Sequence, residues 1–176
     1  MLGVLLGRVI DELRLRIDLH EYPRDYAEYV ERAAEDYGVP ENILYAVIHT
    51  ESSFRSDAVS PKGAIGLMQL MPDTYDWICF LRRKDAEPAP DLTDPAVNID
   101  AGAYLLHYLY EKFSDWETVY AAYNAGYARV NAWLEDESVS ENGKLVNIPY
   151  PETQEYVRKV RRACEKYAAL YGDSSE

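Results

Sequence analysis

The chain has 176 residues, of which 31 are acidic and 18 are basic, so its formal net charge is −13 at pH 7. Proteins that bind nucleic acid draw affinity from lysine and arginine at phosphates, and this charge therefore argues against nucleic acid as a partner. Apolar residues make up 48% of the chain, yet no stretch approaches the roughly 18 consecutive apolar residues of a membrane span. We therefore expect one soluble globular domain with a substantial core.

The first 24 residues are predicted to be an amphipathic extension that precedes the main domain, which we place at residues 25–173. Residues 5–19 have apolar and charged side chains at helical spacing. Such a helix could pack on a partner or on the domain itself. The apolar start of the chain is too short for a signal peptide, has no basic residues before it and meets Arg8 at once, so no export signal is recognisable.

The rest of the chain has the pattern of successive helices separated by polar turns. A second helix is expected to end at Gly38, and Pro40 starts a third that runs to Glu51. No strand-like alternation is sustained, so the fold is predicted to be mainly α. Further helices are expected to start at Pro72, at Asp94-Pro95, at a capping box of Ser114 and Glu117 that leads to Gly126, near Arg129 and at Pro151, with polar loops at 52–66, at 82–94 and around Asn142-Gly143.

Cysteine and histidine positions give no indication of a metal site or a cofactor. Cys79 and Cys164 are too few for a disulfide framework, and we interpret them as core thiols, with a single bridge left open. The three histidines are scattered without the short spacing that a metal site needs. We therefore expect neither metal nor cofactor.

Glu51 is the candidate catalytic group because it stands on an apolar helical face. It follows Val47 and Ile48 by four and three residues, and residues at these spacings share one side of a helix. Burial of a carboxyl group raises its pKa toward the range in which it can act as a general acid near neutrality. A glutamate at a helix end that reaches solvent is the alternative, and spacing alone leaves both interpretations open.

Residues 51–72 (ESSFRSDAVSPKGAIGLMQLMP) resemble the signature of the soluble lytic transglycosylase (SLT) domain, a relative of goose-type lysozyme. Three further motifs of that family follow in order: NIDAGAYL at 98–105, AAYNAG at 121–126 and ETQEYV at 152–157. One departure is GYARV at 126–130, where the family usually has GPGRV. The resemblance implies a lysozyme-like α domain with a small irregular or short β-hairpin segment beside the cleft, at residues 52–66.

The resemblance also implies an activity, that of a peptidoglycan lytic transglycosylase. Glu51 would protonate the glycosidic oxygen between N-acetylmuramic acid and N-acetylglucosamine. The same carboxylate would then deprotonate the muramoyl 6-hydroxyl, which closes on the anomeric carbon to give a 1,6-anhydro sugar without water. Most glycosidases need a second carboxylate, and the candidates near Glu51 in sequence fit solvated or capping roles better: Asp57, Asp73, Asp76 and Asp100.

Six other side chains receive roles from the resemblance. Tyr156 would hydrogen-bond the Glu51 carboxylate and orient it, although its place on an inner helical face also fits a core tyrosine. The other five would contact the sugars, and each residue type is also common in loops, cores or helix ends. They are Ser60, Gln69, Met71, Tyr123 and Asn124, and the family places Met68 near the cleft as well.

The expected partner is therefore the glycan strand of peptidoglycan. This substrate lies outside the cytoplasm, so we expect the protein in the cell envelope or secreted. An export signal or a membrane anchor would then lie outside this chain, or a host system would deliver the enzyme. Two other functions remain open: a muramidase on the same fold, which uses water, and a glycan-binding module without activity.

Overall fold

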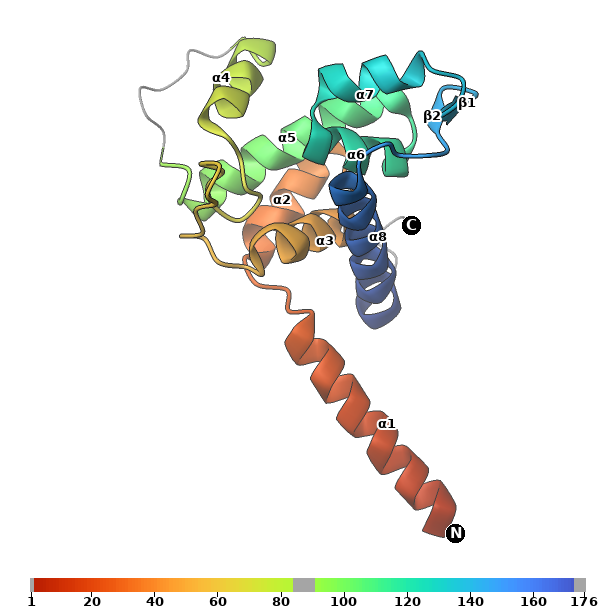
Figure 1. The fold of residues 1–176 in the computed structure, drawn as a ribbon. Coiled ribbons are helices and arrows are strands. Elements are labelled where there is room, and N and C mark those ends of the chain that lie inside the picture. Colours follow the sequence, from red (N-terminus) through yellow and green to blue (C-terminus); the bar gives the residue numbers. More distant parts are fainter. Residues whose placement is uncertain (1, 84–90, 173–176) are drawn as a thin grey trace.

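The computed structural model describes residues 2–83 and 91–172, which form eight helices and a two-stranded sheet (Figure 1). This architecture confirms the predicted mainly α class. Among the described residues, no helix is both long and apolar enough to cross a membrane. The elements are α1 (Leu2–Glu21), α2 (Ala27–Tyr37), α3 (Glu41–Ser52), α4 (Pro72–Leu81), α5 (Pro95–Phe113), α6 (Trp116–Ala125), α7 (Tyr127–Leu134), β1 (Ser140–Glu141), β2 (Lys144–Leu145) and α8 (Pro151–Tyr171).

Helices α3 and α5 form the centre of the core. Every residue of α3 from Ile43 to Ile48 is buried, so protein covers this helix on all sides. It packs along α8 and against α2, while α5 packs against α2 and α6. The carboxyl end of α3, where Glu51 lies, is therefore delivered to the inside of the domain and not to its surface.

The observed helices begin close to the positions predicted from the sequence, and the cap of α6 is the exception. Asp94 caps α5 as predicted, because its carboxylate accepts hydrogen bonds from backbone N–H groups of the first turn. The capping box predicted at Ser114 and Glu117 is wrong. Ser114 instead ends α5 in a left-handed conformation, and Asp115 caps α6 by accepting a hydrogen bond of 3.0 Å from the Thr118 N–H.

Two short stretches of extended backbone replace parts of the predicted loops. Residues 52–70 contain isolated antiparallel bridges that pair Val59 with Ile65 and Ile65 with Leu70, which matches the irregular segment expected there. The loop around Asn142-Gly143 contains the β1–β2 hairpin, which the sequence interpretation missed. Both turn residues have positive φ, and Asn-Gly is a strong signal for such a turn.

Asn98 ties the irregular segment to the central helix. The side chain is completely buried on α5. Its Oδ1 accepts a hydrogen bond of 2.7 Å from the Met68 N–H, and its Nδ2 donates to the carbonyl oxygens of Ile65 and Leu92 at 2.9 and 2.8 Å. One amide therefore satisfies three buried backbone groups from two segments that are far apart in sequence.

Gly66 allows this close approach. Its φ is +81°, and a Cβ atom there would lie 2.2 Å from the Leu92 carbonyl oxygen and 2.3 Å from Asn98 Nδ2. A side chain at this position would therefore displace the tether itself. Leu92 is buried at the end of the predicted 82–94 loop, of which residues 84–90 lie outside the described residues.

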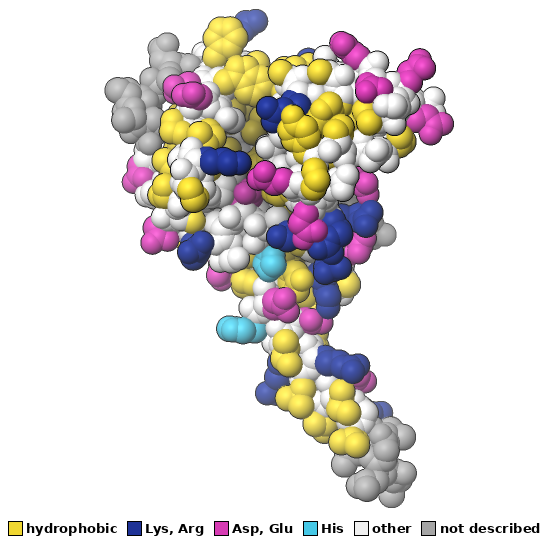
Figure 2. All heavy atoms as spheres, in the orientation of Figure 1, with side chains coloured by type: hydrophobic (Ala, Val, Ile, Leu, Met, Phe, Trp, Pro, Cys, Tyr) yellow, Lys and Arg dark blue, Asp and Glu magenta, His cyan; other side chains and the backbone are white. Residues whose placement is uncertain are grey.

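Helix α1 is longer than the predicted 5–19 helix and projects away from the domain (Figure 1). Its apolar side chains are exposed, with Leu6 61%, Leu13 54% and Ile17 63% accessible. Figure 2 shows hydrophobic side chains in yellow along this projecting helix. Near the domain, Asp18 pairs with Lys166 of α8 at 3.0 Å. The described part of α1 is thus attached at its carboxyl end and does not lie along the domain.

The two cysteines lie on different helices. Cys79 is buried on α4 and Cys164 is half-buried on α8, and no disulfide joins them. The bridge that the sequence left open is therefore not formed in this structure.

The Asn98 tether predicts a large loss of stability on truncation. Asn98→Ala leaves the Met68 N–H and the Leu92 carbonyl without partners, whereas the Ile65 carbonyl keeps the Leu70 N–H. This loss should lower the free energy of unfolding by roughly 3 kcal/mol. Asn131→Ala, on the exposed side of α7, is the matched control and should change it by less than about 0.5 kcal/mol. Urea denaturation of both variants measures the difference, and equal small losses would contradict the tether.

Candidate active site

Glu51 lies in the last turn of α3, next to the fully buried Val47 and Ile48. Burial raises the pKa of its carboxyl group to about 7, and the nearby Tyr156 hydroxyl opposes part of this rise. A buried carboxyl group avoids charge because the apolar surroundings solvate the ionised form poorly. Glu51 is therefore partly protonated near neutral pH, as a general acid must be.

Two phenols approach this carboxyl group. The Tyr156 hydroxyl on α8 is buried and has no hydrogen-bond partner within bonding distance among the described residues. Burial raises the pKa of Tyr156 well above its usual value, and the charge of Glu51 raises it further. The pKa of Tyr123 on α6 is raised by the same two causes. Both phenols therefore stay protonated. The Tyr123 proton is donated to the Met68 carbonyl oxygen at 2.8 Å, so Tyr156 is the phenol that can donate to the carboxylate.

Glu51 opens onto a pocket of about 280 Å³. Its wall is built by the end of α3, the irregular segment up to the first turn of α4, the end of α6, Leu105 of α5 and Glu152 of α8. The five side chains predicted to contact sugars all line it, whereas Tyr156 is buried and is not part of the lining. Those five are Ser60, Gln69, Met71, Tyr123 and Asn124.

Ser60 and Gln69 also shape the segment that carries them. The Ser60 Oγ accepts a hydrogen bond of 3.0 Å from the Ala64 N–H. The Gln69 side-chain nitrogen donates to the carbonyl oxygens of Ala58 and Gly66, at 3.1 and 2.9 Å. These bonds hold the two side chains in place. They occupy the Gln69 amide nitrogen, so its amide oxygen is the group that can meet a ligand.

Met68 belongs to the hydrophobic core, whereas Met71 and Asn124 line the pocket. Met68 is fully buried, so it belongs to the core, whereas Met71 at the start of α4 is 37% exposed and lines the pocket. Asn124 is exposed, which excludes the alternative of a buried helix-end amide. Its Oδ1 accepts a hydrogen bond of 2.9 Å from the Thr153 hydroxyl, which fixes the amide beside the pocket.

The wall includes residues that the sequence interpretation did not select. Lys62 and Glu152 line the pocket and form an exposed ion pair of 3.6 Å between Nζ and Oε1. Lys62 and Glu152 lie inside the family motifs at 51–72 and 152–157, and this position in the sequence could have identified them. Within the described parts of the chain, Glu152 is the other carboxylate on this wall, and none of the four aspartates considered from the sequence lines it. Asp100, for example, pairs with Arg82 at 2.6 Å elsewhere.

No group of three or more potential metal ligands occurs among the described residues. The chemistry available in the pocket is thus that of one buried acid with a raised pKa, two protonated phenols, and amide and hydroxyl groups suited to polar ligands. A carboxyl group of this kind can transfer a proton to and from a substrate oxygen near neutral pH.

Comparisons with known proteins agree with this geometry. The family profile described as "Transglycosylase SLT domain" matches residues 28–146. The soluble lytic murein transglycosylase of Escherichia coli K12 is 31% identical over 175 residues, which cover 97% of this chain and 26% of the relative. The membrane-bound lytic murein transglycosylase C of Haemophilus influenzae PittGG is 34% identical over 139 residues, covering 73% of this chain and 39% of the relative. The chain spans about a quarter of the first relative's length.

Two solved structures share the fold. The 70 kDa soluble lytic transglycosylase of Escherichia coli aligns with a TM-score of 0.79 and 30% identity, covering 89% of this chain and 26% of that one. An inactive glutamate-to-glutamine mutant of lytic transglycosylase Slt from Pseudomonas aeruginosa aligns with a TM-score of 0.76 and 31% identity, covering 87% of this chain and 25% of that one. The likeness agrees with the predicted lysozyme-like class.

The raised pKa of Glu51 predicts that Glu51→Gln stabilises the protein at high pH. The folded-state pKa of about 7 exceeds the ordinary value of 4.5, so the folded state binds more protons and stability falls as pH rises between these values. At pH 8 the glutamine variant should be more stable by roughly 2 to 3 kcal/mol, and near pH 4 the gain should vanish.

Thermal melting at both pH values measures this difference. Glu152→Gln, in the same pocket but with its carboxylate in solvent, is the matched control and should show no such gain at pH 8. A Glu51→Gln variant with equal melting shifts at pH 4 and pH 8 would contradict the burial argument.

Proposed function

The chain belongs to the transglycosylase SLT domain family, as the resemblance of its four motifs predicted, and from that premise we propose that it is a peptidoglycan lytic transglycosylase. It cleaves the β-1,4 bond between N-acetylmuramic acid and N-acetylglucosamine and leaves a 1,6-anhydromuramoyl end. The observation that carries this proposal is the buried Glu51, with a pKa of about 7, on the wall of a pocket lined by polar side chains.

In the first step Glu51 acts as the acid. Its protonated carboxyl group donates the proton to the glycosidic oxygen, and the bond from that oxygen to the anomeric carbon breaks. The leaving sugar departs as a neutral alcohol, and positive charge develops on the muramoyl ring. The carboxylate that remains stabilises this charge at short range, because the buried site has a low effective dielectric.

In the second step the same group acts as the base. The Glu51 carboxylate takes the proton of the muramoyl 6-hydroxyl, whose oxygen then bonds to the anomeric carbon. Glu51 is protonated again, and no water enters the product. A single carboxyl group suffices in this scheme because the substrate supplies the nucleophile. The inactive glutamate-to-glutamine mutant of the Pseudomonas aeruginosa relative supports the need for one such group.

Tyr156 is a positioning residue in this proposal. Its buried hydroxyl has no partner within bonding distance among the described residues, and its pKa is coupled to the charge of Glu51. Donation to the carboxylate would satisfy the hydroxyl and fix the orientation of Glu51 after the first proton transfer. This hydrogen bond strengthens as charge develops, so it favours the transition state over the ground state.

The other wall residues hold the sugars. The Ser60 hydroxyl, the Gln69 amide oxygen and the Asn124 amide offer hydrogen bonds to hydroxyl and acetamide groups, while Met71 and the Tyr123 ring offer apolar surface to sugar faces. Residues 25–173 form the catalytic domain of this proposal and residues 1–24 an extension, although residue 173 lies outside the described residues. Because peptidoglycan lies outside the cytoplasm, we place the protein in the cell envelope or outside the cell.

A muramidase is the second candidate, because Glu152 lines the same pocket and could activate a water molecule. Its carboxylate is exposed and paired with Lys62, which favours the single-carboxylate scheme. A binding module without activity is less well supported, because such a module needs no buried acid with a pKa of about 7.

The proposed acid and base can be tested by digestion of purified peptidoglycan. Glu51→Gln should keep the fold but lower turnover by about 100- to 10,000-fold, the usual contribution of a general acid-base group. Glu155→Gln, on α8 with its carboxylate paired to Arg158, is the control and should retain turnover. Mass spectrometry of the products should find ends lighter than hydrolysed ends by one water. Hydrolysed ends, together with loss of turnover in Glu152→Gln, would instead favour the muramidase.

Tyr156→Phe separates positioning from packing. The variant removes a hydroxyl that has no partner within bonding distance in the described part of the chain, so the free energy of unfolding should change by less than about 1.5 kcal/mol. Misorientation of Glu51 should lower kcat by roughly 10- to 100-fold with KM little changed. Melting and turnover are measured on one preparation. Unchanged kcat with a large loss of stability would show that Tyr156 serves only the core.

A further inference from the structure

A second hollow continues from the Glu51 pocket along the space between α4 and α7. Its volume is about 420 Å³, which falls in the range of about 300–1,000 Å³ typical of ligand sites. Thr74, Leu105 and Tyr123 line both hollows. A ligand that fills the Glu51 pocket can therefore extend directly into the second one.

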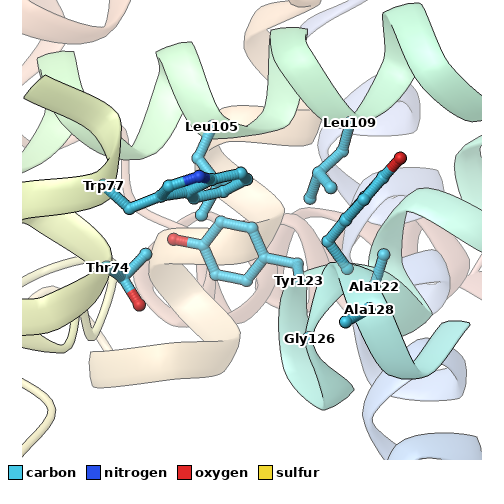
Figure 3. Close-up of a pocket in the computed structure, with 9 residues that line it drawn as sticks. Thr74, Trp77, Leu105, Leu109, Ala122, Tyr123, Gly126 and Ala128 are labelled. Carbon is cyan, nitrogen blue, oxygen red and sulfur yellow. The ribbon is translucent and has the colours of Figure 1, made fainter. Parts of the chain in front are cut away.

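The lining of this second hollow is apolar and aromatic. Figure 3 shows the Trp77 indole and the Tyr123 ring facing the hollow, with Leu105 and Leu109 of α5 behind them. Tyr127 of α7 completes the lining, and its ring centroid lies 6.5 Å from that of Trp77. Among the described residues, no lysine, arginine, aspartate or glutamate lines the hollow, so its chemistry suits a neutral ligand with an apolar face.

Tyr127 stands at the departure from the family pattern, GYARV in place of GPGRV. Its ring packs against Phe113 and Tyr108 at centroid distances of 5.6 and 6.1 Å, and Tyr108 also meets Trp77 edge-on at 5.2 Å. These contacts hold both rings in place before any ligand arrives. Binding then costs little side-chain entropy, which makes the aromatic surface an efficient contact.

We propose that Trp77 and Tyr127 form an aromatic subsite for a neutral N-acetylhexosamine unit of the glycan strand, beyond the units held at Glu51. The apolar C–H face of the sugar ring packs on these aromatic rings, and its hydroxyl groups remain in water at the open side. Trp77 lies outside the four family motifs, and Tyr127 stands where the family usually has proline. The inference rests on the proposed function in one respect, that the strand crosses the Glu51 pocket.

The subsite can be tested by binding, separately from catalysis. The full chain carrying Glu51→Gln is titrated calorimetrically with the β-1,4-linked pentamer of N-acetylglucosamine. Trp77→Ala and Tyr127→Pro, each added to it, should weaken pentamer binding by roughly 3- to 10-fold, the effect of losing one aromatic contact. Trp133→Phe, on α7 but packed against Tyr150, is the control and should leave the affinity unchanged.

Tyr127→Pro is designed to fold. Tyr127 is the first residue of α7, where proline is well tolerated, and the ψ of 142° at Gly126 suits a residue before proline. The variant thus removes the ring without breaking the helix, and a thermal melt verifies this. If Trp77→Ala proves unstable, Tyr127→Pro alone decides the test.

Three results would overturn the subsite: no pentamer binding by the parent protein, affinities within twofold of the parent for both variants, or an equal loss in Trp133→Phe. Failure of the proposed reaction has a different signature, which is hydrolysed product ends with wild-type protein. Anhydro ends combined with unaffected pentamer binding in both variants would remove the subsite and leave the reaction intact.

Discussion

Burial of the Glu51 carboxyl group costs free energy whenever that group is charged, and much of the domain is arranged around this cost. Helix α3 reaches the pocket from inside the core, so the apolar residues that stabilise the helix are the same ones that desolvate its last acidic side chain. Tyr123 and Tyr156 approach from two other helices as neutral phenols, and the Tyr156 hydroxyl is the one free to donate to the carboxylate. The pKa of about 7 is thus a property of the assembled fold and would not exist in an isolated helix.

The pocket wall opposite Glu51 depends on backbone hydrogen bonds supplied by side chains. The Asn98 side chain accepts a hydrogen bond from the Met68 N–H, and the Gln69 side chain donates to the Ala58 carbonyl oxygen. The Tyr123 hydroxyl donates to the Met68 carbonyl oxygen at 2.8 Å. The segment has almost no regular structure of its own, yet these anchors fix it in the absence of ligand. A wall fixed in this way loses little conformational entropy when a sugar binds.

Periodicity and capping residues predicted the helical class and most helix starts, because they record local chemistry. The family motifs placed five further side chains beside Glu51, and all five line its pocket. It missed Asp115 as the cap of α6, because Ser114 one residue earlier is an equally good capping type. Glu152 and the Trp77–Tyr127 contact depend on helices that are distant along the chain, and no spacing rule brings them together. Tyr156 and the five sugar-contacting side chains received their roles from the resemblance, and those roles remain predictions.

Helix α1 has a mechanical consequence. Its 20 residues, at the helical rise of about 1.5 Å per residue, form a rod of about 30 Å that leaves the domain from beside α8. A helix fixes both the distance and the direction of its far end relative to the domain, whereas the end of a flexible linker of equal length would sample many positions. Anything bound at the far end of α1 would stand off from the domain by about the thickness of a bilayer core, with the pocket held at a set reach and angle.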